Sequence, residues 1–232
     1  MIKYEAIILS GGKGTRIKKY TKKIPKCLIK FYGKPFLYYQ LRYLKNNGIS
    51  KVIVSTGYYS EKIKSYLQNK NFIDIKIIND GSIPLGTGGA IFKSLDHLKD
   101  KFFVIYGDSY LNFAIKKLKI KGNLATMAVF KNNNNYDKSN VIFKKRNKII
   151  YSKKNANINS NFIDYGASYL NKKVFKSIKN KKFDLSELYE KISKKDMLTG
   201  YIVKKRFYEI GSYSGIKDFR KYIKNEFNKK LF

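Results

Sequence analysis

The alternation of short apolar runs with amphipathic stretches constrains the fold of this chain more than any other feature. Four apolar runs in the first half predict buried β-strands: Glu5–Leu9, Lys51–Thr56, Ile75–Ile78 and Phe102–Gly107. Apolar residues at helical spacing lie between these runs and predict three helices: Pro35–Asn47, Ser60–Asn69 and Gly89–Leu98. This β-α-β-α order predicts an α/β fold, a Rossmann-like three-layer sandwich in which helices cover both faces of a mostly parallel central sheet.

The pattern changes after about Leu124. Short polar turns now separate four predicted strands: Ala125–Phe130, Asn140–Lys145, Lys148–Ser152 and Asp164–Leu170. Two further helices are predicted near Asp184–Lys194 and Ser214–Asn228, and they flank a last pair of strands around Leu198–Val203 and Tyr208–Ile210. Neither an internal repeat nor a Pro/Ser linker is visible. We therefore expect one domain over residues 1–232, with an antiparallel excursion from the parallel sheet.

Scarce residue types exclude several kinds of site. Cys27 is the only cysteine and His97 the only histidine, which excludes an intramolecular disulfide framework, multi-histidine metal sites and serine-histidine triads. No apolar run approaches the roughly 20 residues that span a bilayer, and the segment "MIKYEAIILS" at the start is typical of a buried strand rather than a signal peptide. We expect a cytoplasmic protein that has no membrane partner.

The formal net charge of +34 raises the alternative of a nucleic-acid-binding protein. Only five of the 50 basic residues are arginine, the side chain that best reads phosphates and bases, and the lysines are scattered along the chain. This distribution favours a compositional bias toward lysine over a built nucleic-acid site. We therefore expect no specific nucleic-acid partner.

A glycine-rich segment follows the first predicted strand, "SGGKGTR" from Ser10 to Arg16. Glycines at this place allow a ligand to approach the backbone and let successive N–H groups point at an anion. The segment is not a Walker A loop, and Ile17 occupies the position of the last glycine in a dinucleotide-binding fingerprint. By itself the pattern leaves a plain tight turn open.

The wider pattern is more specific. The run Gly-Gly-x-Gly-Thr-Arg followed by Pro25-Lys26 resembles the signature of the sugar-1-phosphate nucleotidyltransferases, which join a nucleoside triphosphate to a sugar phosphate and release pyrophosphate. Further segments resemble motifs of that family in the same order: "PLGTGGA" (84–90), "YGDSY" (106–110), "YSKK" (151–154), "IDYGASYL" (163–170) and "FYEIGSYSGIKDF" (207–219). The resemblance covers nearly the whole chain and implies the GT-A-like fold of nucleotide-diphospho-sugar transferases.

The resemblance also implies roles for individual residues. Arg16, Lys26 and Asp108 would be catalytic, and Asp108 and Glu209 would hold Mg²⁺. The nucleotide would contact Leu9, Ser10, Gly11, Gly12, Gly14, Thr15, Gly86, Thr87 and Gly88. The sugar phosphate would contact Gly107, Lys153, Asp164, Tyr165 and Gly166. Residues 1–123 would then form the nucleotide-binding half and residues 124–232 the sugar-phosphate-binding half.

The chemistry explains these residue types. A sugar phosphate is already a nucleophile at neutral pH, so no strong general base is needed. The difficulty lies in bringing two anions together and holding pyrophosphate as it leaves, which is a task of positioning and electrostatic stabilisation. An arginine, a lysine, backbone amides and a metal carboxylate pair are suited to this task.

Six positions depart from the family pattern or leave alternatives open. Glu209 stands where the family usually has aspartate, and Asp164 stands where many relatives have asparagine. The lysine that faces the sugar phosphate could be Lys153, Lys148 or Lys154. Arg16 could instead be a partner in an ordinary surface ion pair, and Lys26 could be a solvated lysine. Asp108 could merely cap a turn after the strand.

The pairing of "PLGTGGA" with a short chain most resembles the heptose-1-phosphate guanylyltransferase group, so GTP and heptose 1-phosphate are the expected substrates, for surface polysaccharide synthesis. Uridylyl, thymidylyl and cytidylyl transfer to another sugar 1-phosphate or another phosphorylated acceptor remain alternatives. A non-catalytic nucleotide-sugar sensor is an alternative of another class. A homo-oligomer is compatible with the sequence.

Overall fold

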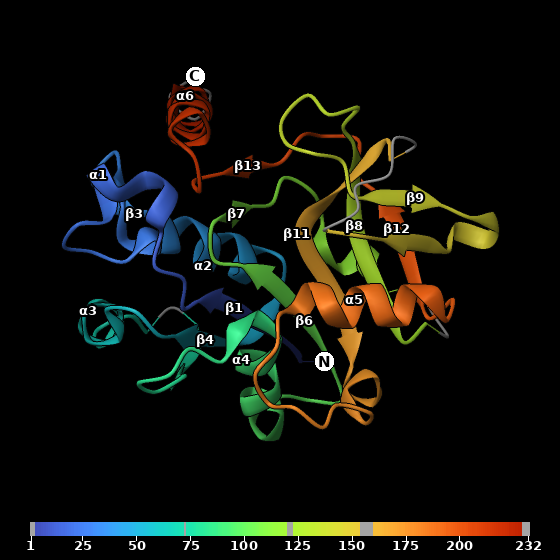
Figure 1. Ribbon diagram of the computed structural model, residues 1–232. Helices are drawn as coiled ribbons and strands as arrows, with labels where there is room; N and C mark the ends of the chain where they lie inside the picture. The colour runs from blue at the N-terminus through green and yellow to red at the C-terminus, as the bar shows by residue number, and fades with distance from the viewer. Residues whose placement is uncertain (1–2, 72, 120–122, 154–159, 229–232) are drawn as a thin grey trace.

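The computed structural model describes residues 3–71, 73–119, 123–153 and 160–228, and its centre is a nine-stranded mixed sheet (Figure 1). Four parallel strands occupy one side of the sheet: β1 (Tyr4–Ser10), β4 (Ile49–Thr56), β5 (Asp74–Asn79) and β6 (Lys101–Tyr106). They lie in the order β6-β1-β4-β5. This arrangement confirms the predicted parallel sheet and brings the carboxyl ends of all four strands to one edge.

Helices cover both faces of this sheet, as predicted. The side chains of β1 alternate between two hydrophobic clusters: Ala6 and Ile8 pack with α2 (Phe36–Asn46) and α3 (Ser60–Leu67), whereas Ile7 and Leu9 pack with α4 (Gly86–Ser94) and α5 (Leu185–Lys194). Strand alternation thus gives the three-layer sandwich.

The antiparallel excursion is built around β11 (Phe162–Asn171), which pairs antiparallel with β6 and with β8 (Ala125–Lys131). The short strands β9 (Val141–Phe143) and β10 (Ile149–Tyr151) extend this half. The register of β11 against β8 shifts between Asp164 and Ser168, and Gly166 within the shift has a φ of 86°. This bulge bends the strand at the residues that the sequence singled out.

The predicted pairing of the last two strands is wrong. Strand β12 (Leu198–Ile202) runs parallel to β8, whereas β13 (Tyr208–Glu209) pairs with β7 (Ser109–Tyr110). The segment 203–207 leads the chain away from β8 toward the end of β6. The sequence contains no turn signal that predicts this change of direction. Its consequence is that Glu209 lies beside the segment that contains Asp108.

Two helix boundaries refine the prediction. Helix α2 stops before Gly48, whose φ of 71° suits the residue just past a helix end. Helix α4 begins at Gly86, three residues earlier than predicted, and a 3₁₀ turn, Leu95–His97, follows it. The remaining 3₁₀ turns are Thr15–Ile17, Lys26–Leu28, Ile115–Leu118, Lys145–Asn147 and Lys172–Phe175.

A third, smaller hydrophobic cluster lies outside the sandwich. We call it the side cluster: Ile17, Ile29, Phe31, Phe36, Tyr39, Ile210, Ile216, Phe219 and Ile223. It joins the short helix α1 (Lys18–Thr21) and the hairpin of β2 (Lys30–Phe31) and β3 (Lys34–Pro35) to α6 (Tyr213–Asn228), which stands apart from the sheet in Figure 1. The loop that carries Arg16 and Lys26 therefore rests on the same core as the segment after Glu209.

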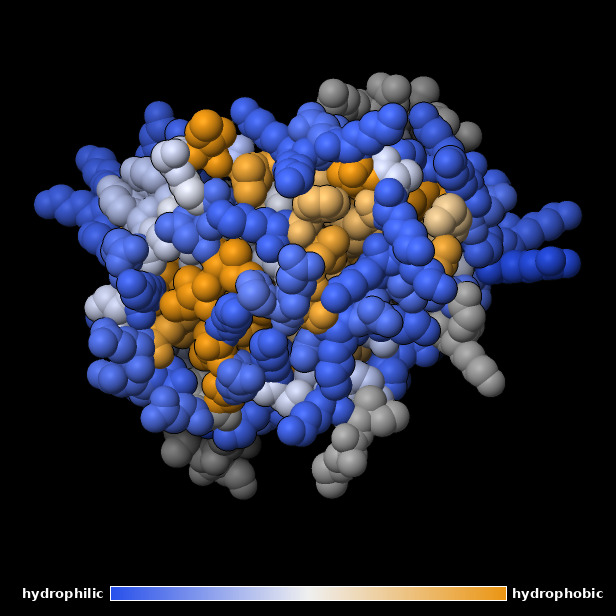
Figure 2. All heavy atoms as spheres, turned by 90° about the horizontal axis from the view of Figure 1, so that it is seen from below, coloured by the Kyte–Doolittle hydropathy of each residue, from blue (hydrophilic) through white to orange (hydrophobic). Residues whose placement is uncertain are grey.

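The face of the molecule seen in Figure 2 is mostly hydrophilic and carries several hydrophobic patches. Within the described ranges, every helix is too short or too polar to cross a bilayer.

Candidate active site

The glycine-rich segment leaves β1 at the carboxyl edge of the parallel strands. Gly14 has a φ of 65°, and a Cβ there would stand 2.9 Å from Thr21 Cγ2, so glycine is required by both backbone and space. The Thr21 hydroxyl donates a hydrogen bond to the Gly14 carbonyl at 3.1 Å. In the part of the chain that the structure describes, no hydrogen bond is donated by the backbone amides of Gly11 to Thr15. These amides are available to an anion.

Lys26 and Asp108 meet although 82 residues separate them. Lys26 begins a 3₁₀ turn after Pro25, and Asp108 follows β6. The Lys26 Nζ lies 2.6 Å from the Asp108 Oδ2, and the two side chains are only 18% and 23% exposed. This contact excludes a freely solvated Lys26. It also places the Lys26 ammonium group directly beside the Asp108 carboxylate.

Arg16 and Glu209 complete the group around Gly211. A Cβ on Gly211 would stand 2.9 Å from Glu209 Oε2 and 3.0 Å from both Arg16 Nη2 and Asp108 Oδ2. Three functional groups from three distant segments thus surround one point. Among the described residues the salt bridges include none to Arg16, so its guanidinium group can donate hydrogen bonds to a phosphate.

The donor set suits a magnesium ion that phosphates would help to hold. Glu209 accepts hydrogen bonds from the Gly211 amide and the Ser212 hydroxyl, which orient its carboxylate and leave further lone pairs. The described residues contain no group of three or more His, Cys, Asp or Glu that could hold a metal. Two carboxylates agree with Mg²⁺, which keeps waters and substrate phosphates as its other ligands.

The turn at Gly107 fixes Asp108 relative to β1. The Gly107 amide donates to the Leu9 carbonyl at 3.0 Å, and a Cβ on Gly107 would stand 2.3 Å from that oxygen. The Ile210 amide donates to the Asp108 carbonyl at 2.9 Å. Gly107 is therefore needed for the close approach of two backbones, and its predicted contact with a sugar phosphate stays a prediction.

The glycines of "PLGTGGA" pack against the start of α5. The amides of Gly88 and Gly89 donate to the Phe183 carbonyl at 3.0 and 3.1 Å, and a Cβ on Gly88 would stand 2.2 Å from the Phe183 ring. The Thr87 hydroxyl accepts from the Leu185 amide at 2.8 Å. The sequence did not show this packing role, and the predicted nucleotide contacts of Gly86, Thr87 and Gly88 stay predictions.

Asp164 lies in a closed polar network on the sugar side of the predicted site. The Tyr106 hydroxyl donates to Asp164 Oδ2 at 2.9 Å, and the Gly166 amide donates to Oδ1 at 2.8 Å. Burial raises the pKa of the Asp164 carboxyl from 3.8 to about 6, against the opposing effects of these two donors and of Lys153. An asparagine at this position would avoid the cost of a buried charge.

Two other residues predicted on the sugar side differ in exposure. Tyr165 is fully buried, and its hydroxyl donates to the Arg206 carbonyl at 3.0 Å, so its side chain supports the core and does not face a ligand. Lys153 is exposed, and its backbone amide donates to Glu190 Oε1 at 2.9 Å. Lys148 precedes β10, whereas Lys153 follows it, and Lys154 lies outside the described residues. Of the described candidates, Lys153 is the one near Asp164.

Sequence reasoning missed Asp80, which follows β5 at the same sheet edge. Its Oδ2 would lie 3.3 Å from a Cβ on Gly11, and its amide donates to the Thr56 carbonyl at 2.8 Å. Burial raises the pKa of the Asp80 carboxyl, while the Ser55 hydroxyl, which donates to Oδ1 at 3.4 Å, opposes that rise. A polar residue directly after a predicted parallel strand was the signal that could have found it.

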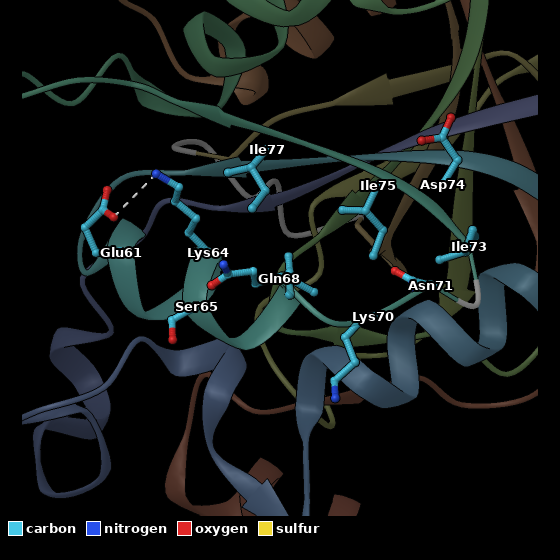
Figure 3. Close-up of a pocket in the computed structure, with 11 residues that line it drawn as sticks. Glu61, Lys64, Ser65, Gln68, Lys70, Asn71, Ile73, Asp74, Ile75 and Ile77 are labelled. Carbon is cyan, nitrogen blue, oxygen red and sulfur yellow. Dashed lines mark ion pairs between the residues drawn. The ribbon is translucent and has the colours of Figure 1, made fainter.

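A separate groove lies away from these residues. It has a volume of about 920 Å³ and runs between α3 and the edge strand β5, where Ile75 and Ile77 face Lys64 and Gln68 (Figure 3). None of its lining residues belongs to the motifs above. The candidate site is instead the strip along the carboxyl ends of β6, β1, β4 and β5, from Asp108 through Gly11 to Asp80.

Comparison with known proteins shows the family and the fold of the chain. A family model described as "Nucleotidyl transferase" matches residues 5–226. The chain is similar to D-glycero-alpha-D-manno-heptose 1-phosphate guanylyltransferases from two bacteria. It is 33% identical to that of Campylobacter jejuni, over 89% of this chain and 94% of the relative. It is 31% identical to that of Aneurinibacillus thermoaerophilus, over 88% of this chain and 87% of the relative.

A solved structure shares the fold over its whole length. The crystal structure of HddC from Yersinia pseudotuberculosis matches with a TM-score of 0.80 at 25% identity, covering 95% of this chain and 99% of that one. The same Yersinia protein has also been crystallised in complex with GMP-PN.

Proposed function

The chain belongs to the nucleotidyl transferase family and is a sugar-1-phosphate nucleotidyltransferase, and from this premise we propose that its substrates are GTP and a heptose 1-phosphate. The products would be a GDP-heptose and pyrophosphate. The observation that carries the proposal is the convergence of Arg16, Asp108 and Glu209 on one point, with Lys26 paired to Asp108 at 2.6 Å. Two cations, two carboxylates and open amides suit the joining of two phosphates.

The reaction needs charge and position more than proton transfer. A phosphate oxygen of the sugar 1-phosphate attacks the α-phosphorus of GTP and forms a new phosphorus–oxygen bond. The bond from that phosphorus to the oxygen bridging to the β-phosphate breaks, and pyrophosphate leaves with the electron pair. In our proposal Arg16 and the amides of Gly11 to Thr15 hold the triphosphate, while Lys26 turns from Asp108 to the reacting phosphates.

Asp108 and Glu209 would hold Mg²⁺, which supplies neutralisation of phosphate charge when it is bound. The hydrogen bonds from Gly211 and Ser212 keep the longer Glu209 side chain folded back toward Asp108. This local orientation supports glutamate as a substitute for the aspartate that the family usually has here.

The position of Asp80 supports guanine as the base. A nucleotide whose phosphates lie at Arg16 and Lys26, and which extends past Gly11 along the ends of β1 and β4, brings its base toward Asp80, whose Oδ2 would lie 3.3 Å from a Cβ on Gly11. An ionised carboxylate accepts hydrogen bonds only, and guanine offers two adjacent donors, N1–H and the 2-amino group. We propose that Asp80 accepts from both.

ITP tests this contact because inosine lacks the 2-amino group. The wild type should use GTP about tenfold better than ITP in kcat/KM, the effect of one hydrogen bond to a charged group. In Asp80→Ala the two nucleotides should become equivalent. An unchanged preference in Asp80→Ala would show that another residue contacts the amino group.

We further propose that residues 1–123 bind the nucleotide and residues 124–232 bind the sugar phosphate, with Lys153 and Asp164 facing it. A cytoplasmic location fits this assignment, since nucleoside triphosphates are made there.

A pyrophosphate-release assay tests the proposed function. The protein would be given Mg²⁺ and each of GTP, CTP, UTP, dTTP and ATP, crossed with heptose 1-phosphate and other sugar 1-phosphates. We expect release with GTP and heptose 1-phosphate, lost in Asp108→Asn. Release with another pair would replace the substrates, and nucleotide binding without release from any pair would favour the sensor.

A further inference from the structure

Helix α2 carries one amide side chain on its buried face. Phe36, Leu37, Leu41 and Leu44 on that face are apolar and fully buried, as the helical pattern predicts. Gln40 lies among them and is 2% exposed. Glutamine is seldom buried this deeply unless its polar atoms have partners. No motif of the sequence includes Gln40, so its partners define what it does.

The Gln40 side chain holds both ends of the segment that carries Asp108. Its Nε2 donates to the Tyr106 carbonyl at 2.9 Å and to the Ser109 carbonyl at 2.9 Å. Only Gly107 and Asp108 lie between these two carbonyls. One NH₂ group therefore fixes the span of the turn across 66 to 69 residues of sequence.

The carbonyl oxygen of the Gln40 amide, unlike its NH₂ group, forms no hydrogen bond with the described residues. This atom, Oε1, is buried. A buried acceptor without a partner costs about 1–3 kcal/mol, a cost that an apolar side chain of similar length would avoid. The two N–H donors are thus the part of Gln40 that the structure uses.

These donors restrain the turn from a third direction. The Leu9 carbonyl of β1 accepts from the Gly107 amide, and the amide of Ile210, directly after β13, donates to the Asp108 carbonyl. Helix α2 adds the restraint on both flanks. The Asp108 carboxylate must lie beside Lys26 and near Glu209, and sites of this kind need their groups held to within about 0.5 Å.

We propose that Gln40 is a positioning residue that holds the Asp108 carboxylate in place for the metal and the transferring phosphate. This inference rests on the proposed function for the role of Asp108. It assigns to α2, which carries no residue of the motifs, a direct hold on the catalytic turn.

The test compares Gln40→Met with Tyr43→Phe. Methionine has similar length and no donor. Tyr43 lies one turn further along α2, and its hydroxyl donates to the Phe113 carbonyl, so Tyr43→Phe removes another helix-to-loop hydrogen bond away from Asp108. The readout is Mn²⁺ binding to the complex with a non-hydrolysable GTP analogue, followed by the loss of the free-ion EPR signal, together with kcat and thermal stability.

We expect Gln40→Met to weaken Mn²⁺ binding about tenfold or more, the usual effect of losing a group that orients a metal ligand, and to lower kcat by a similar or larger factor. Binding of the analogue without metal should stay unchanged, and Tyr43→Phe should change stability alone. Wild-type Mn²⁺ affinity and kcat in Gln40→Met, with only stability reduced, would overturn the inference.

Two safeguards keep the test decisive. If Gln40→Met does not fold, Gln40→Glu, which has the same shape and at most one proton to donate, makes the same comparison. The proposed function fails separately, since it requires the wild type itself to bind Mn²⁺ with the analogue and to release pyrophosphate from GTP.

Discussion

The nucleotide side and the sugar side of the site satisfy their polar groups in opposite ways. Around Gly11 to Thr15 the amides are open, and Lys26 and Asp108 form one ion pair at the surface of the site. Around Asp164 the Tyr106 hydroxyl and the Gly166 amide already donate to the carboxylate of this half-buried residue. The first region can receive a large anionic ligand on its open amides without losing a hydrogen bond there, and only the Lys26–Asp108 pair has to open. In the second region both carboxylate oxygens already accept hydrogen bonds from protein groups, so the region is preorganised before a ligand binds.

The strongest test of this contrast is the removal of charge on the nucleotide side. Lys26→Ala or Asp108→Asn should lower kcat by roughly 10²–10³-fold, the typical loss when a preorganised electrostatic contact is removed. Steady-state pyrophosphate release measures the effect. Lys23→Ala, which removes an exposed lysine of the same loop, is the control and should stay near the wild-type rate. A near wild-type rate in either site variant, with the fold intact, would disprove the site.

Filling the space between the charged groups should have the next largest effect. In Gly211→Ala the new Cβ would stand within 3.0 Å of atoms of Glu209, Arg16 and Asp108, so these side chains must separate. We expect kcat to fall about tenfold to a hundredfold, since displacements of about 1 Å in a site have such costs. Unchanged kcat in Gly211→Ala would show that the convergence is not needed.

The packing of the "PLGTGGA" segment predicts an effect on stability. In Gly88→Ala the Cβ would meet the Phe183 ring at 2.2 Å, and we expect a loss of about 1–3 kcal/mol in the free energy of unfolding. Gly12→Ala, whose Cβ meets no atom within 4 Å, should keep its stability. Urea unfolding of both variants measures the difference. Equal stability would place Phe183 elsewhere in solution.

The smallest effect concerns the sugar side. Because the pKa of Asp164 is about 6 when folded and 3.8 otherwise, the folded protein binds the proton more tightly, and stability falls as pH rises through this interval. Asp164→Asn removes that loss, so it should raise the melting temperature above pH 6 and lose its advantage as pH falls toward 4. A destabilised Asp164→Asn above pH 6 would show that the charge itself is needed there.

Much of the fold and part of the site could be read from the sequence because their signals are local. Gly14 and Asp108 belong to short runs in which strand, turn and function coincide. The hydrogen bonds of Gln40 and the contact of Gly88 with Phe183 depend on segments tens of residues apart, which no local pattern links. The predicted pairing of β12 with β13 was wrong for the same reason, since the partner of a strand depends on how all strands of the sheet pack together.

The most direct test of the central claim is a double-mutant cycle on Lys26 and Asp108. If the charged groups act as one unit around the transferring phosphate, the double variant of Lys26→Ala and Asp108→Asn should be little slower than the slower single variant. Losses that multiply, to roughly 10⁴-fold or more from singles of about 10²-fold, would contradict it and show two independent contributions.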